Sequence, residues 1–290
     1  MQIESQITRD YFGFWHEGVD YMASFYNDNS NTFVNGTKSK DYIQNYYGNN
    51  VTINSGAGND TVKNFGEHVT ILSGKGNDSV TSQGDSIKIY GGAGNDSIYN
   101  SYGENVTISG DSGNDFIYSC GDNVKIDGGK GKDFIINYSE DVTLTGGKGN
   151  DTIIIASDYS KNNVIKYVSG DGNDTISGFN SDDTLHITKG SYKVKTSGND
   201  VVVTVGKGKI TLKDAKGQKI SIKNSKGKVT TKTYGSSSSN VAELFAENNF
   251  ATANNLSEIV KNNLTATDYK VENQNFETLM KENLITFATK

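Results

Sequence analysis

Acidic side chains recur at a fixed spacing through the middle of this 290-residue chain. Asp78 and Asp96 lie eighteen residues apart, and a single step of nineteen separates Asp96 from Asp115. A fixed period of this length is typical of a solenoid, in which each repeat buries its apolar face by stacking on its neighbours. Strands of adjacent turns lie about 4.8 Å apart, so one carboxylate per turn forms a column of like charges. Such a column predicts bound cations.

Each repeated aspartate ends a six-residue loop that is rich in glycine, such as Gly91–Asp96. Glycine tolerates positive φ, so these loops can turn sharply and direct several backbone carbonyls inward. Calcium is a hard cation that takes six to eight oxygens at about 2.3–2.6 Å, whereas magnesium requires a tighter octahedron and keeps its waters. Histidine and cysteine are nearly absent from the loops, which disfavours zinc and copper. The loop chemistry therefore favours Ca²⁺, shared between stacked turns.

Short apolar segments occupy the rest of each period. A branched side chain such as Ile98 follows the loop, and an alternating segment such as Val106–Ile108 follows half a period later. This alternation predicts short strands with one buried face. Each turn of eighteen residues therefore holds two strands and two tight turns. The chain has no proline, which fits strands that are paired on both sides.

The array resembles the nonapeptide repeats of RTX (repeats-in-toxin) haemolysin-type calcium-binding proteins, whose pattern is Gly-Gly-x-Gly-x-Asp-x-apolar-x. The match covers residues 55–178. The resemblance implies an all-β fold, a parallel β-roll (a right-handed β-solenoid with about 18 residues per turn), with Ca²⁺ between stacked turns. The ligand positions that it implies are the aspartates Asp60, Asp78, Asp96, Asp115, Asp133, Asp151 and Asp174, with the backbone of Gly56, Gly58, Gly74, Gly76, Gly92, Gly94, Gly113, Gly129, Gly131, Gly147, Gly149, Gly170 and Gly172.

Three departures from the family pattern refine this expectation. The second nonapeptide of each turn has valine or isoleucine at the aspartate position, so we expect calcium along one edge only, with at most six ions. Asp111 replaces a loop glycine and either alters that site or adds a ligand. Asp151 and Asp174 are twenty-three residues apart, so an insertion around Ser157–Asn163 must bulge outward for the last site to form.

The opposite edge carries an acidic column of its own. Two interpretations are open, namely a second row of weaker cation sites or solvated turn residues that keep this edge soluble, and we favour the second. The column consists of Glu67, Asp85, Glu104, Asp122 and Glu140.

Composition shifts divide the chain into five segments. Residues 1–35 are rich in aromatic side chains and predict an N-terminal cap, with a helix expected over about residues 5–26. Residues 36–178 are the calcium-binding β-roll, and residues 179–234 predict a β-meander that closes its far end. A serine-rich linker at 235–240 precedes a small helical segment at 241–290.

The resemblance also implies secretion. RTX proteins leave the cell by type I secretion through an uncleaved C-terminal signal, and residues 241–290 are similar to such a segment, although a docking cap would look much the same. The chain has neither a signal-peptide pattern nor an apolar run of membrane-spanning length. We therefore expect a secreted or bacterial cell-surface module that folds on calcium binding after export. Its expected partners are calcium, the type I machinery and an upstream domain of a larger toxin, adhesin, surface-layer protein or exoenzyme.

Other functions have weaker support. No nucleophile elbow, zinc helix or phosphate-binding loop occurs, and His16, His68 and His186 are scattered, so no catalytic residues are expected. Residues 189–232 carry twelve lysines, which we interpret as protection of β-edges rather than as a nucleic-acid surface. The alternative function is a calcium-stabilised solenoid that recognises a surface or a carbohydrate. Threonines alternate with lysines along its strands, as in Thr107 and Lys125, which disfavours that alternative.

Overall fold

The computed structural model describes residues 8–9, 22–156 and 160–235. The helical segment expected at 241–290 and most of the linker lie outside the described residues. Within those described ranges every regular element is a β-strand, so no helix there could span a membrane.

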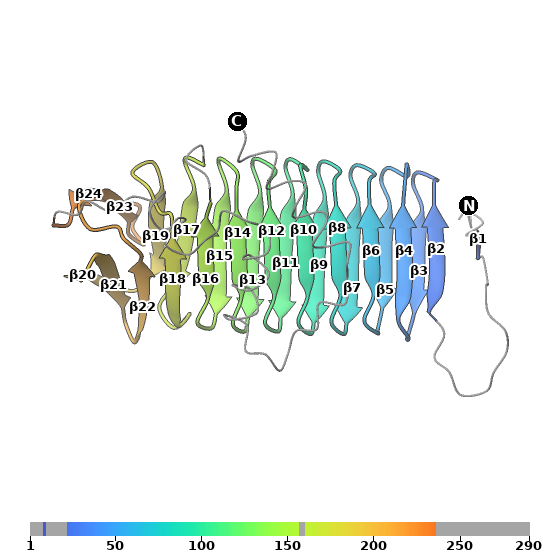
Figure 1. The fold of residues 1–290 in the computed structure, drawn as a ribbon, viewed down its shortest axis with the longest axis horizontal. Coiled ribbons are helices and arrows are strands. Elements are labelled where there is room, and N and C mark those ends of the chain that lie inside the picture. Colours follow the sequence, from blue (N-terminus) through green and yellow to red (C-terminus); the bar gives the residue numbers. More distant parts are fainter. Residues whose placement is uncertain (1–7, 10–21, 157–159, 236–290) are drawn as a thin grey trace. The chain divides into compact units, whose positions relative to one another are not determined.

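The chain winds as a roll of about nine turns, and each turn contributes one strand to each of two facing sheets (Figure 1). Within the roll, neighbouring strands of each sheet run parallel, as the sequence predicted. The first sheet has the order β1 (Thr8–Arg9), β2 (Ala23–Asn27), β4 (Asp41–Asn45), β6 (Thr61–Asn64), β8 (Ser79–Ser82), β10 (Ser97–Asn100), β12 (Phe116–Ser119), β14 (Phe134–Asn137), β16 (Thr152–Ile155), β18 (Asn173–Ser177), β22 (Gly208–Leu212), β21 (Asp200–Val205) and β20 (Tyr192–Ser197). The second sheet has the order β24 (Val229–Thr233), β23 (Lys219–Lys223), β19 (Thr184–Lys189), β17 (Val164–Val168), β15 (Thr143–Lys148), β13 (Lys125–Lys130), β11 (Thr107–Ser112), β9 (Lys88–Ala93), β7 (Thr70–Lys75), β5 (Thr52–Gly56) and β3 (Phe33–Thr37).

A thin aliphatic core lies between the two sheets. Ile98 of β10 pairs with Val80 on one side and with Ile117 on the other, and all three side chains are fully buried. Ile108 of the facing sheet pairs in the same way with Ile89 and Ile126. Since a strand turns successive side chains to opposite faces, the alternating apolar residues fill the core and set the register of every turn.

The roll begins earlier in the chain than residue 36. Ala23–Asn27 (β2) already pairs in parallel with β4, and Phe33–Thr37 (β3) pairs with β5. The helix expected over residues 5–26 is therefore wrong at its C-terminal end. Phe25 explains the difference, because it occupies the core position that Ile43 holds one turn later.

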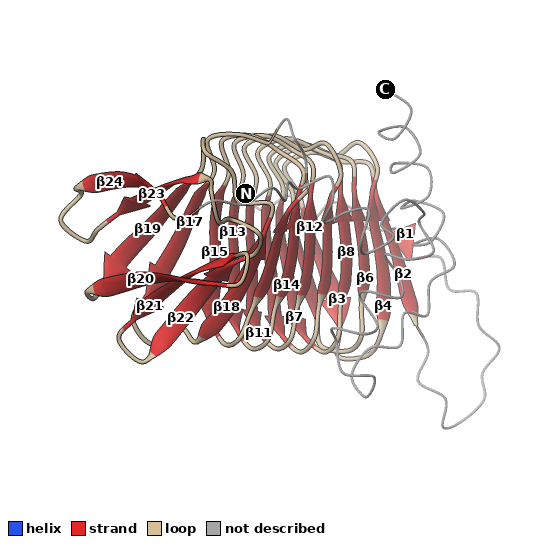
Figure 2. Cartoon of the chain, turned by 60° about the vertical axis from the view of Figure 1, so that its left-hand side comes forward, coloured by secondary structure: helices blue, strands red, loops and turns tan. Residues whose placement is uncertain are grey.

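Antiparallel strands extend both sheets at the far end of the roll (Figure 2). β20, β21 and β22 form the expected meander on the first sheet, where β22 joins β18 in parallel. β23 instead continues the second sheet in parallel with β19, and β24 folds back on it. The segment after β19 therefore extends both sheets, with β20–β22 on the first sheet and β23–β24 on the second.

Candidate metal centre

The repeated aspartates lie in one buried column. The loops that end in them connect each strand of the second sheet to the next strand of the first, and we call this side of the roll the aspartate edge. Between 0 and 4% of the surface of each of the seven predicted aspartates is exposed. Asp174 joins the column despite the longer spacing before it, because β18 keeps register with β16.

A hydrogen-bond ladder stacks the carboxylates. The backbone N–H of Asp78 donates to Oδ1 of Asp96 over 2.8 Å, and the N–H of Asp115 donates to Oδ1 of Asp133 over 2.8 Å. The same contact recurs along the column and ends with the N–H of Asp151 donating to Oδ1 of Asp174 over 3.1 Å. One oxygen of each carboxylate therefore binds the backbone of the preceding turn.

The second carboxylate oxygen, Oδ2, indicates that the column needs a further ligand. In the described part of the chain, a buried Oδ2 without a hydrogen-bond partner occurs at Asp60, Asp78, Asp115, Asp133 and Asp151. A buried anion is costly unless it is paired or binds a metal. These oxygens therefore require a proton or a cation.

Burial raises the pKa values of the stacked aspartates. It raises the pKa of Asp115 to about 9, against a hydrogen bond from Asp96 and with added repulsion from Asp133, Asp96 and Asp111. The other shifts have burial as their main cause too: the pKa rises to about 8 for Asp78 and Asp174, to about 7 for Asp96 and Asp133, and to about 6 for Asp151. Near neutral pH, Asp78, Asp115 and Asp174 therefore keep a proton unless a cation replaces it.

The predicted loop glycines have the backbone conformation expected of them. At Gly92 and Gly94, φ is +103° and +132°, and a Cβ atom there would overlap the carbonyl oxygens of Gly74 and Gly76. Positive φ is shared by Gly56, Gly58, Gly74, Gly76, Gly113, Gly129, Gly131, Gly147, Gly149, Gly170 and Gly172. Turns can stack this closely only where the side chain is missing.

The first loop position also matters, and the sequence interpretation missed it. A Cβ atom at Gly128 would lie 2.5 Å from Oδ2 of Asp133 and 2.5 Å from the carbonyl oxygen of Gly146 in the next turn. Glycine at this position therefore leaves room for two oxygens of adjacent turns to approach one point. In the sequence, the pair of consecutive glycines Gly128-Gly129 indicates that the first loop position also requires glycine. Gly91, Gly110 and Gly146 hold the same position, whereas Ser55, Ser73 and Ser169 replace it in three turns.

The donor set suits calcium. Among the described residues, no three side chains of histidine, cysteine, aspartate or glutamate converge on one point. A cation on the aspartate edge would thus take one carboxylate per turn and draw its remaining ligands from backbone carbonyls. Several neutral oxygens with few carboxylates match the coordination of Ca²⁺.

The column reaches one turn beyond the predicted ligands, to Asp41. Its Oδ2 accepts hydrogen bonds from the N–H and the hydroxyl of Thr37, over 2.5 and 3.0 Å. Thr37 and Ser39 stand where later loops have glycine. Asp41 is therefore satisfied within its own turn and continues the stack without an open oxygen.

Asp111 is the exception within the row. It has a positive φ of 69°, the conformation that glycine adopts elsewhere at this position. Its exposed carboxylate accepts a hydrogen bond from the Ser109 hydroxyl over 2.5 Å. The charge of Asp111 raises the pKa of both Asp96 and Asp115, so this turn concentrates negative charge more than its neighbours.

Asparagine side chains connect adjacent turns along the opposite edge of the roll. Asn27 donates from Nδ2 to Oδ1 of Asn45 over 2.7 Å, and Asn45 donates likewise to Asn64 over 2.7 Å. The acidic column on this edge lies outside that ladder, with Glu67, Asp85, Glu104 and Asp122 exposed and Glu140 half-buried. Asparagine recurs on this edge at the period of the repeat, and this recurrence in the sequence would have predicted the ladder. The buried positions of the ladder are Asn27, Asn45, Asn64, Ser82, Asn100, Ser119 and Asn137.

A comparison with known families agrees with the repeated loops. A family model described as "RTX calcium-binding nonapeptide repeat (4 copies)" matches residues 47–63, 88–101, 102–123, 109–141, 127–154 and 167–191. No curated protein matches the chain. One solved structure, the extracellular lipase LipA from Serratia marcescens, aligns at 15% identity and a TM-score of 0.30 over 63% of this chain, which spans 37% of the length of the lipase.

The fold is a parallel β-roll with a column of buried carboxylates along one edge. The repeats that build it are RTX calcium-binding nonapeptide repeats.

Proposed function

We propose that this chain is the calcium-binding module of a larger secreted protein and that it folds when calcium binds after export. One observation carries the proposal: buried carboxylates are stacked at one edge, and in Asp60, Asp78, Asp115, Asp133 and Asp151 the described residues leave the Oδ2 atom without a hydrogen-bond partner. Calcium at this edge would neutralise the column and link each turn to the next.

The proposed ligands are the seven predicted aspartates, Asp60 to Asp174, and the carbonyl oxygens of the glycine loops. The first-position glycines belong to this set, because Gly146 O and Asp133 Oδ2 approach the same point beside Gly128. Seven stacked loops hold at most six ions between them. The asparagine ladder supports restriction to one edge, because Asn27, Asn45 and Asn64 hydrogen-bond to one another without a metal.

Calcium binding should drive folding. Without a cation the column must hold repelling anions or take up protons, and ordering the backbone costs about 1–2 kcal/mol per residue. A ligand that binds only the folded state adds its binding free energy to stability. Extracellular calcium modules bind in the range of about 10⁻⁴–10⁻³ M, so the roll would stay unfolded in the cytosol and fold outside.

The cellular role follows from that switch. An unfolded chain can be threaded through a secretion channel, and folding on exit opposes its return. Type I secretion machinery is the proposed partner, with residues 241–290 as the signal. A toxin, adhesin, surface-layer protein or exoenzyme would supply the upstream domain, and the roll itself would have a structural role without catalysis.

Circular dichroism tests the proposal directly. EDTA-stripped protein is titrated with calcium and, separately, with magnesium. A cooperative gain of β-signal with calcium alone supports the folding switch. A β-rich spectrum that EDTA leaves unchanged contradicts it and favours the alternative, in which the solenoid recognises a surface or a carbohydrate.

A further inference from the structure

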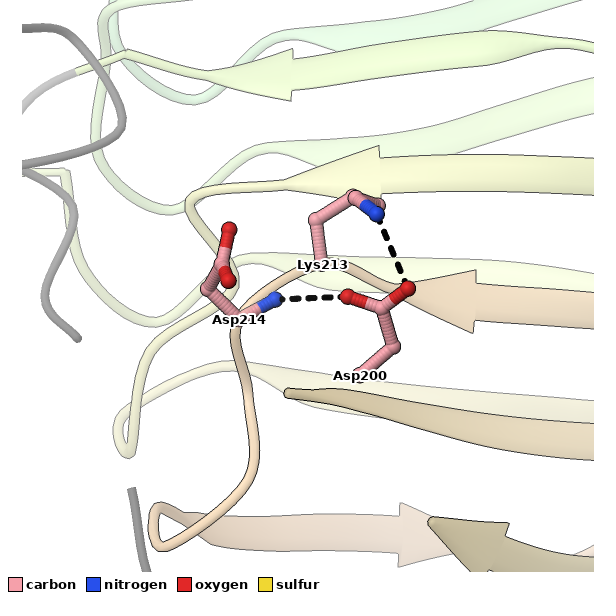
Figure 3. Close-up of polar contacts among 3 residues, drawn as sticks. All are labelled: Asp200, Lys213 and Asp214. Atoms are coloured by element: carbon pink, nitrogen blue, oxygen red, sulfur yellow. Dashed lines mark hydrogen bonds and ion pairs between the residues drawn. The ribbon is translucent and has the colours of Figure 1, made fainter. Parts of the chain in front are cut away.

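Positive charge gathers at the end of the roll opposite β1. Residues 189–232 carry twelve lysines and only two acidic residues, Asp200 and Asp214. Asp200 binds the ammonium of Lys213 over 2.8 Å and accepts the backbone N–H of Asp214 over 3.1 Å (Figure 3). This is the one ion pair found in the part of the chain that the structure describes. The charge of the remaining lysines is therefore largely uncompensated.

Two lysines and a histidine stand side by side on inner strands. Lys166 of β17 pairs in register with His186 of β19, which pairs with Lys223 of β23. All three are half-buried, and burial together with the charges of Lys223 and Lys166 lowers the pKa of His186. Protection of sheet edges does not explain them, because β17, β19 and β23 are each paired on both sides.

Two more lysines lie close to Lys223 on the outer side of the second sheet. Lys219 alternates with buried Ile220 and so faces outward with Lys223, and Lys226 follows in the turn after β23. Strands β17, β19, β23 and β24 contain no acidic residue. We call Lys166, His186, Lys219, Lys223 and Lys226 the basic face.

Hydroxyl groups lie between these charges. Thr184 pairs with Ser221, and the hydroxyl of Ser221 lies 2.9 Å from that of Thr231. The outward positions of β17, β19 and β23 hold no phenylalanine, tyrosine or tryptophan on which bases could stack, as proteins that bind single-stranded nucleic acids require. Cations with interspersed hydroxyls suit a polymer that has both anionic groups and hydroxyls.

From these observations we propose that the basic face binds an anionic polysaccharide. The polymer would lie across the strands, and its sulfate or carboxylate groups would meet the cations at the strand spacing of about 4.8 Å. This site lies apart from the aspartate edge and extends beyond the proposed calcium-dependent folding.

Dextran sulfate and uncharged dextran provide a matched pair of probes, because only the sulfate groups differ. Binding to the full, calcium-saturated chain is measured by titration at constant ionic strength. The test variant is Lys219→Gln/Lys223→Gln/Lys226→Gln. The control, Lys88→Gln/Lys125→Gln/Lys161→Gln, removes the same charge elsewhere on the roll. Circular dichroism with calcium confirms that each variant folds, so that loss of folding is distinguished from loss of binding.

We expect dextran sulfate to bind and dextran not to bind, with at least a ten-fold loss of affinity in the test variant and less than a two-fold loss in the control. Equal losses in the two variants would mean diffuse attraction and would overturn the proposal. No binding of dextran sulfate would also overturn it. So would tighter binding of duplex DNA or of anionic lipid vesicles, because either result would assign the face to another class of partner.

Discussion

The backbone N–H of Asp115 donates to Oδ1 of Asp133, one turn further along the roll, over 2.8 Å. This contact fixes the position of the Asp133 carboxylate and leaves its Oδ2 buried without a hydrogen-bond partner among the described residues. Asp133 therefore joins two turns and has an oxygen that a cation could bind. In the proposed function, the folding of the roll and its binding of calcium are coupled through this side chain.

Replacing a central aspartate should weaken more calcium sites than replacing an aspartate at the end of the row. Asp96→Ala should weaken two adjacent calcium sites, since the residue is shared between them, whereas Asp60→Ala should weaken mainly one. Asp60 stacks on Asp41, whose Oδ2 is satisfied by Thr37, so no open site is expected on that side. Calcium stoichiometry by isothermal titration distinguishes the two variants. Equal losses in both would argue against shared sites.

A methyl group at the first loop position should damage a site by steric overlap alone. In Gly128→Ala the added Cβ lies 2.5 Å from both Asp133 Oδ2 and Gly146 O, and overpacking of this kind costs about 1–3 kcal/mol. We expect a calcium midpoint raised roughly ten-fold, which corresponds to about 1.4 kcal/mol. Ala93→Ser, at an exposed position of the same edge, is the control and should leave the midpoint unchanged. A normal midpoint in Gly128→Ala would remove this position from the site.

The effect of pH should reverse when calcium is added. The pKa of Asp115 rises to about 9 and that of Asp78 to about 8 on folding, so protonation favours the calcium-free folded state. In EDTA, the stability from these groups is fully present below the unfolded pKa near 4 and is lost as pH rises through about 8–9. With calcium, affinity should instead increase with pH, because the metal displaces the protons.

Circular dichroism in EDTA and urea unfolding in saturating calcium, each at pH 5 and pH 8, measure the two trends. A stronger β-signal at pH 8 than at pH 5 in EDTA would contradict the burial of ionisable carboxyl groups in the folded roll.

The asparagine ladder should contribute stability independently of calcium. Asn45→Ala removes the donor to Asn64 Oδ1 and to Gly48 O, and the acceptor of Asn27. Buried groups left unpaired cost about 1–3 kcal/mol, so the thermal midpoint of the calcium-loaded protein should fall while the number of bound ions stays the same. Gln83→Ala, on an exposed turn of the same edge, is the matched control. A loss of bound calcium in Asn45→Ala would show that the two edges are coupled.

The periodic parts of the fold and site were predictable from the sequence. Ile98, Ile117 and Ile135 recur at the repeat spacing, and a one-residue slip would turn each of them to the wrong face, so the repeat determines both sheets and their register. The same spacing places Asp78, Asp96 and their equivalents in one column. Glycine at Gly92 and Gly94 indicates where turns approach too closely for a side chain.

The sequence by itself therefore determined the roll, its period and the acidic edge, because these depend on local alternation repeated many times. Only the tertiary structure decided how each group is satisfied. It showed that Oδ1 of Asp133 is occupied by a backbone donor while Oδ2 is open, that Asn45 and Asn64 bind each other across turns, and that β23 leaves the meander to extend the second sheet. It also aligned Lys166, His186 and Lys223, which lie twenty and thirty-seven residues apart. Such contacts join residues of different turns, and strand pairing alone determines which of them meet.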